Sequence, residues 1–147
     1  MIADIHKAFQ NLCNNALSIP IKYENTTYTP DSKTTFAFFQ LGPVNTTRQS
    51  QGQCKWLTYE GEATLTIKVD VKTGVDEAYE LADTLIAYAL ENSLTDGLRL
   101  LEPPYVEASE QEFDWLALPV QIPFLAEGNT NDGTEGRKAN KACCPNC

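Results

Sequence analysis

Strict alternation of apolar and polar residues runs from Glu62 to Lys72 and predicts a β-strand with one wet face. After the turn at Thr73 and Gly74, the apolar period changes to that of an amphipathic helix, which is expected to end near Asn92. Because the turn is so short, we expect the helix to fold back across the sheet. The apolar positions are Ala63, Leu65, Ile67, Val69 and Val71 in the strand, and Val75, Ala78, Tyr79, Ala82, Leu85, Ile86, Ala89 and Leu90 in the helix.

The N-terminal segment contains a second helical pattern. Apolar residues recur at three- and four-residue steps from Ile2 to Leu17, which predicts a first amphipathic helix ended by Ser18 and Pro20. A short alternating stretch follows as far as Tyr23, and its early proline predicts a strand at a sheet edge.

The next expected strand runs from Thr34 to Leu41 and is apolar on both sides. Phe36 and Phe38 fall on one side, and Ala37 and Phe39 on the other. Such a strand is either central in its sheet or covered by a partner subunit.

A polar stretch without a hydrophobic period runs from Gly42 to Gln53, and we expect it to form a long loop or a protruding hairpin. A new strand begins at Cys54, and Gly61 predicts a bulge within it. The segment from Cys54 to Lys72 is therefore either one long bent strand or two pieces.

The C-terminal part of the domain is expected to add further strands. Two short extended stretches, Leu98 to Leu101 and Tyr105 to Ser109, precede a longer one from Phe113 to Phe124. Pro119 and Pro123 lie on one side of this last strand and predict that it occupies an edge.

Together these elements predict an α+β fold. It has a mainly antiparallel sheet of about four to six strands, with two helices packed on one face and a protruding loop or hairpin. The domain is expected to cover residues 1–126. Residues 127–147 contain no large apolar side chain and predict a flexible, disordered tail rich in Gly, Asn and Thr.

Composition narrows the class of protein. A chain of 147 residues with 42% hydrophobic residues is sufficient for one domain with its own core. Its net charge of −9 would repel nucleic acid and anionic membranes, although a channel through which DNA slides would favour this sign. The sequence shows no signal peptide and no apolar run long enough to span a bilayer, so we expect synthesis in the cytoplasm and no membrane contact.

Catalytic motifs are absent from the sequence. His6, the one histidine, lies in the first helix without a surrounding motif and is expected to be solvated or at the edge of the core. There is no glycine-rich phosphate loop, nucleophile elbow or His-Glu-x-x-His helix. An acidic cluster is expected to form a solvated turn and not a metal or acid–base site; it consists of Glu107, Glu110 and Glu112. The sequence therefore predicts neither an enzyme nor a bound cofactor.

The cysteines fall into two groups. Cys13 and Cys54 lie in patterned segments and are expected to be buried free thiols. Cys143, Cys144 and Cys147 end the polar tail, where one C-x-x-C pair supplies only half of a zinc site and does not open a helix as a redox pair would. A functionally silent tail is favoured, with metal capture or intermolecular disulfides as alternatives.

The order of these elements resembles the tail terminator proteins of long-tailed bacteriophages. The likeness rests on order and spacing, from an amphipathic helix through an aromatic strand and a long polar loop to a glycine-containing strand, a helix and a final strand. The tail that ends in cysteines departs from the family pattern. The segments that carry the resemblance, which covers roughly Met1 to Ala126, are Gly61, Val69-Asp70-Val71, Gly74 and Leu81-Ala82-Asp83.

The resemblance implies an α/β fold that assembles as a hexameric ring, caps the tail tube, stops its growth and offers a surface to the neck of the DNA-filled head. The implied partners are further copies of the chain, the tail tube protein and the head–neck stopper protein, while DNA passes through without specific binding. The implied location is the head-proximal end of the virion tail.

A ring would also remove the apolar strand surfaces from water, because a heterologous interface closes on itself. The wet strand face can meet solvent, a neighbouring subunit or the DNA channel. The alternatives are another phage neck, connector or tail-completion protein, or a small metal- or redox-binding protein that uses the terminal cysteines. The residues expected to contact a neighbouring subunit or the tube are Asn45, Thr46, Arg48, Gln51, Lys55 and Trp56.

Overall fold

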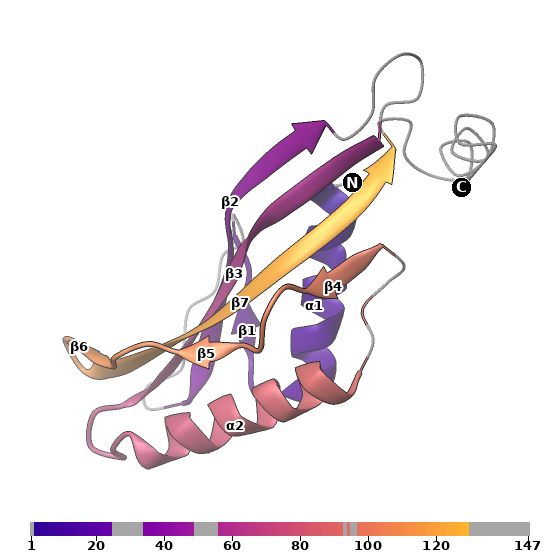
Figure 1. Cartoon of the computed structure of the whole chain (residues 1–147). Coiled ribbons are helices and arrows are strands. Elements are labelled where there is room, and N and C mark those ends of the chain that lie inside the picture. The colour runs from indigo at the N-terminus through magenta and orange to yellow at the C-terminus, as the bar shows by residue number, and fades with distance from the viewer. Residues whose placement is uncertain (1, 25–33, 49–55, 93, 95–96, 130–147) are drawn as a thin grey trace.

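A computed structural model describes residues 2–24, 34–48, 56–92, 94 and 97–129, and within these residues two helices pack against a sheet of seven strands (Figure 1). The elements in chain order are α1 (Ile2–Ala16), β1 (Ile21–Lys22), β2 (Phe36–Arg48), β3 (Trp56–Asp70), α2 (Asp76–Glu91), β4 (Leu98–Leu100), β5 (Tyr105–Val106), β6 (Glu110–Glu112) and β7 (Trp115–Asn129).

The sheet has the order β1-β2-β3-β7-β4, with β5 and β6 also paired to β7. All of these pairs are antiparallel except β1 with β2. The α+β class and the mainly antiparallel sheet are confirmed. The described strands outnumber the predicted four to six because one edge of the sheet is divided into three short pieces, β4, β5 and β6.

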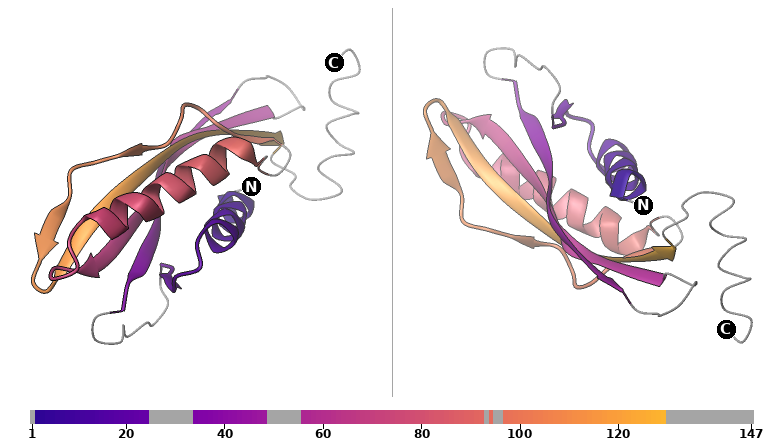
Figure 2. Two further views of the ribbon diagram at one scale, coloured as in Figure 1. Left: turned by 90° about the horizontal axis from the view of Figure 1, so that it is seen from below. Right: turned by 90° about the horizontal axis from the view of Figure 1, so that it is seen from above.

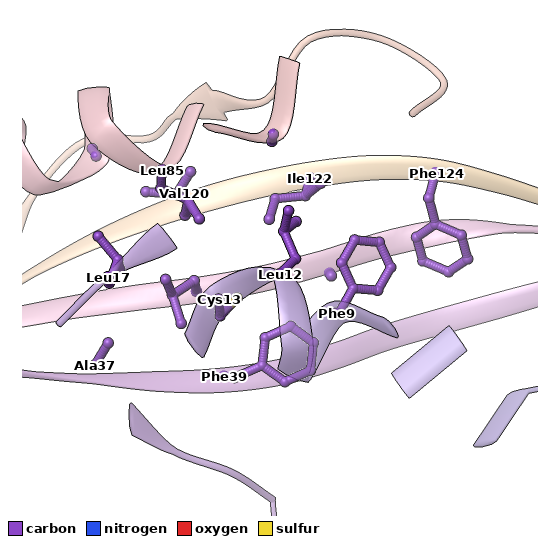
Figure 3. Packing of buried hydrophobic residues seen from close by; sticks show 14 of the residues in the cluster. Phe9, Leu12, Cys13, Leu17, Ala37, Phe39, Leu85, Val120, Ile122 and Phe124 are labelled. Carbon is purple, nitrogen blue, oxygen red and sulfur yellow. The ribbon is translucent and has the colours of Figure 1, made fainter. Parts of the chain in front are cut away.

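Both helices cover the same face of the sheet, as predicted (Figure 2). From α1, Phe9 lies 5.2 Å from Phe124 of β7 and 6.2 Å from Phe39 of β2, measured between ring centroids. From α2, Leu85 lies over Val120 in the same core (Figure 3). Burial of these side chains between helix and sheet supplies the main favourable term in folding.

The predicted alternation of β3 is confirmed as far as Asp70, where the strand ends, and Val71 and Lys72 lie in the turn that follows. Ala63, Leu65, Ile67 and Val69 are fully buried beneath the helices, whereas the residues between them are only half-buried. The strand is continuous from Trp56 to Asp70, so the segment forms one long strand and not two pieces.

The polar residues after Leu41 are not a loop where the structure describes them. β2 continues to Arg48 and pairs with β3, with a shift in register between Leu41 and Val44. The loop prediction is therefore wrong for residues 42–48, and the alternative of a hairpin holds there. Residues 49–55 lie outside the described residues. The polar composition misled the prediction, because this end of the strand is exposed and needs no apolar side.

The bulge predicted at Gly61 of β3 lies instead in β2, where Gly42 and Pro43 stand opposite the single residue Glu62. A Cβ atom on Gly61 would stand 2.6 Å from the carbonyl oxygen of Pro43, and one on Gly42 would stand 2.7 Å from that of Glu62. Glycine is therefore required on both strands, because the two backbones approach too closely for a side chain.

The predicted edge position of the last strand is wrong. β7 lies inside the sheet, between β3 and the divided edge. Pro119 falls between the residues paired with β6 and β5, and Pro123 between those paired with β5 and β4. Their carbonyl oxygens accept hydrogen bonds at this edge from the N–H groups of Glu107 (2.9 Å) and Leu101 (3.0 Å). In an antiparallel strand, the N–H and C=O of one residue point to the same side. The N–H groups that Pro119 and Pro123 lack would therefore face the breaks between β6, β5 and β4, where no strand needs them as donors.

β1 lies at the opposite edge, as its proline predicted. β2 is next to it, and its second apolar side is partly covered. The Phe36 ring meets the Trp115 ring edge-on at 5.0 Å, and the Lys22 ammonium lies 5.4 Å from the centroid of Phe38. β7 continues to Asn129, three residues into the predicted tail, and residues 130–147 with their three cysteines lie outside the described residues.

Candidate functional site

The far end of the β2–β3 hairpin carries most of the predicted contact residues. Beyond the bulge, Asn45 pairs with Glu60, Thr46 with Tyr59, and Arg48 with Leu57. Asn45, Thr46, Thr47 and Arg48 are all exposed. β7 runs along the other side of β3, so three strands form an arm with a polar outer strand (Figure 1).

The structure divides the predicted contact residues between two faces. Thr46 and Arg48 lie on the side that the helices occupy, because their partners Tyr59 and Leu57 continue the buried alternation of β3. Asn45 and the half-buried Trp56 lie on the opposite side. The hairpin end therefore presents two faces and one edge. Gln51 and Lys55 lie outside the described residues.

The free edge of β2 is the second feature of this site. β1 pairs with β2 only at Ala37 and Phe38, and the N–H of Leu41 donates to the Glu24 carboxylate. From Val44 to Thr47 no described strand pairs with this edge. Unpaired N–H and C=O groups on an edge strand are a template for another chain.

A polar network covers the sheet face opposite the helices. The Thr64 hydroxyl lies 2.6 Å from Gln121 Oε1, and Lys68 forms an ion pair of 2.9 Å with Glu112. The Tyr105 hydroxyl donates to Glu62 at 2.8 Å. This hydrogen bond raises the pKa of Tyr105, followed by desolvation and then by the charges of the surrounding carboxylates. Neither helix covers this face, so it is available to solvent or to a neighbouring molecule.

The groups with catalytic potential in α1 are held in structural contacts. The His6 ring lies 5.5 Å from Phe39 and 6.4 Å from Tyr23, both edge-on, at the border of the core as predicted. Cys13 is a buried free thiol, also as predicted, and burial raises its pKa to about 12. The Tyr23 hydroxyl donates to Asn14 Oδ1 at 2.7 Å, and its pKa is about 12, raised mainly by burial.

The described residues contain neither a metal-binding cluster nor a helix that could cross a membrane. Among them, no group of three or more His, Cys, Asp or Glu side chains is placed to hold a metal ion. No helix there is both long and apolar enough to span a membrane. Cys143, Cys144 and Cys147 lie outside this part of the chain, as does Cys54.

The sequence reading missed one exposed aromatic residue. Phe113, predicted as the start of the last strand, instead lies in the turn between β6 and β7 and is 96% exposed. Its immediate neighbours are Glu112 and Asp114. The sequence could have predicted this exposure, because a single phenylalanine between two carboxylates has little apolar surface nearby to pack against.

The fold defines a two-layer α+β domain with a helix-covered sheet, a long hairpin and a polar outer face. No protein-family model matches the chain. No curated protein matches it.

Several solved structures are similar to it. One, whose name states no function, has a TM-score of 0.63 at 16% identity, over 86% of this chain and 95% of that chain. Another, from the virion of a native gene transfer agent particle, has a TM-score of 0.42 at 15% identity, over 82% of this chain and 92% of that chain. The first likeness shows a shared fold alone, and the second carries no argument at its lower TM-score.

Proposed function

We propose that the chain is a structural protein of a long-tailed phage virion, of the tail terminator type. Six copies form a ring that caps the tail tube, stops its elongation and presents a surface to the neck of the head. The protein acts by binding and not by catalysis, and it needs no cofactor. It is assembled in the host cytoplasm and resides at the head-proximal end of the tail.

The observation that carries this proposal is the exposed, polar end of the β2–β3 hairpin on a helix-backed sheet. Asn45, Thr46 and Thr47 are consecutive exposed residues, and no described strand pairs with the outer edge of β2 along them. An unpaired edge of this kind is rarely left without protection in a monomer. A neighbouring subunit or the tube protein would cover it in the assembly.

The charge of the chain supports the same role. At −9, it disfavours adhesion of DNA to a ring through which DNA must pass. The partners are further copies of the chain, the tail tube protein and the head–neck stopper protein, with DNA as a passenger. The resemblance in element order supports this set of partners, and the α+β fold agrees with it.

Control of tube length tests the proposed activity. Purified tube protein is polymerised with and without the chain, and tube lengths are measured by negative-stain microscopy. We expect the chain to arrest growth and to narrow the length distribution. Tubes that grow equally long with a molar excess of the chain would overturn the terminator role.

A further inference from the structure

The β6–β7 turn exposes a large apolar side chain in a backbone conformation that disfavours it. Phe113 is 96% exposed and has a φ of 54°. Within the described part of the chain it is the one residue other than glycine with a positive φ. A left-handed backbone conformation strains an L-residue with a bulky side chain, whereas glycine and asparagine adopt it with less strain. Phe113 thus combines backbone strain with solvent exposure, and it brings no compensating burial to its own fold.

The turn is held in place by its surroundings. The backbone N–H of Val71 donates to the carbonyl oxygen of Asp114 at 3.0 Å, and Lys68 pairs with Glu112 at 2.9 Å. Glu110 and Glu112 share the outer sheet face through their pairing with Ala117 and Trp115. The turn therefore presents an aromatic ring with a carboxylate rim from a fixed position.

The opposite edge of the sheet carries a complementary pair of groups. Lys22 of β1 lies over the ring of Phe38 of β2, with its ammonium 5.4 Å from the ring centroid. Both side chains are half-buried and lie on the outer face, because Phe38 pairs with Thr66 of the polar side of β3. A lysine above an aromatic ring offers a carboxylate partner and an apolar surface together.

Glu110 and Lys22 lie at nearly the same level on opposite edges of the sheet, and Phe113 lies farther along the strands, beyond Glu112. Glu110, Ala117, Lys68 and Phe36 form one cross-strand row, and the row that contains Phe38 is two residues away. Within one chain four strand spacings separate β1 from β6, about 19 Å at roughly 4.8 Å each, so the turn does not reach its own β1 edge. A copy placed beside the first in the same orientation, and shifted by a few residues along the strands, would bring turn and edge together.

We propose that the β6–β7 turn of one copy docks on the β1–β2 edge of the next copy. Phe113 packs against Phe38, and the carboxylate of Glu110 pairs with Lys22. The contact joins two different surfaces, so it is heterologous and repeats from copy to copy until a ring closes. It rests on the proposed ring and names the contact between its subunits.

Replacement of Phe113 separates docking from folding. We expect Phe113→Gly to raise the thermal midpoint of the subunit by about 2–4 °C, because glycine relieves the positive φ. We also expect it to weaken self-association on the order of tenfold or more, as removal of an aromatic anchor does. Phe113→Asn, which tolerates this backbone, should behave in the same way, and Phe113→Tyr should retain association.

Charge exchange tests the pairing directly. Lys22→Glu and Glu110→Lys should each weaken self-association, because each places like charges across the contact. An equimolar mixture of the two variants should recover it, since every contact between unlike copies is then between opposite charges. Lys7→Glu on α1 and Glu91→Lys at the end of α2 are matched controls, and they should leave association unchanged.

Sedimentation equilibrium up to the highest soluble concentration gives the readout. If the native chain associates and neither the Phe113 variants nor the charge pair alter that association, the docking contact is wrong while the ring survives. If the native chain shows no self-association at all, the docking proposal is also wrong. The tube-length assay then decides separately whether the chain terminates tubes.

Discussion

At the scale of single residues, backbone contact at the bulge decides how the long hairpin is built. Gly61 and Gly42 allow β2 and β3 to approach where one extra residue enters β2. The side chain nearest to a Cβ at position 61 is Phe124, at 3.2 Å, and it belongs to the buried core. Neither the backbone of Pro43 nor the ring of Phe124 can move far without disturbing the sheet.

We therefore expect Gly61→Ala to destabilise the fold by about 1–3 kcal/mol through overpacking against backbone. Urea denaturation measures the change in the free energy of unfolding. Gly74→Asn is the control, because no atom lies within 4 Å of a Cβ there and asparagine tolerates its positive φ. Equal stability of Gly61→Ala and the native chain would show that the bulge has room for a side chain.

The buried thiol gives a second prediction at this scale. Burial raises the pKa of Cys13 to about 12, so its reactive thiolate is scarce at neutral pH. Because the folded pKa is raised, the associated stability is present below the ordinary thiol pKa and is lost as pH rises toward 12. At pH 8 we expect iodoacetamide to leave Cys13 unmodified in the native chain and to modify it in urea, as read by peptide mass mapping. Equal labelling in both states would contradict its burial.

At the scale of elements, side-chain period predicted the core and failed at the edges. Both helices and the apolar side of β3 were predicted because burial on one side imposes a period on the residues. The end of β2 was predicted as a hairpin only as an alternative to a loop, because its residues are exposed on both faces and carry no period. The position of β7 in the sheet could not be predicted from its prolines alone. It depends on which side of the strand lacks their N–H donors, and only the strand pairing shows this.

The candidate site was predictable only in part, for a related reason. The polar, unpatterned sequence after Leu41 predicted a contact surface that includes Asn45, Thr46 and Arg48. The structure brings these three residues together at one end of the hairpin. Their division between two faces required the register with β3. The exposed position of Phe113, and the nearness in level of Glu110 to Lys22 on the far edge, required the order and register of the strands.

Reversal of charge at the hairpin end tests this element as a contact surface. We expect Arg48→Glu to impair tube capping while changing the free energy of unfolding by less than about 0.5 kcal/mol, because the residue is exposed. Lys7→Glu on the exposed side of α1 is the matched control for net charge. A large loss of stability would show that Arg48 is packed within the subunit, and normal capping would exclude the hairpin end from the interface.

At the scale of the whole molecule, the two sheet faces have different roles. The helices and the core occupy one face, and the polar network of Thr64, Lys68 and Glu62 occupies the other. The two edges also differ, since one bears the carboxylates and Phe113 and the other bears Lys22. Such an asymmetric subunit is suited to heterologous contacts, which form closed rings or open helices.

Ring formation on the tube is therefore the central claim. Tail tubes incubated with the purified chain are imaged by electron microscopy in end-on views, and bare tubes serve as the reference. We expect one additional annulus with six-fold symmetry at a single end of each tube. Tube ends that stay bare at a saturating concentration of the chain, or an annulus with another symmetry, would contradict the hexameric terminator.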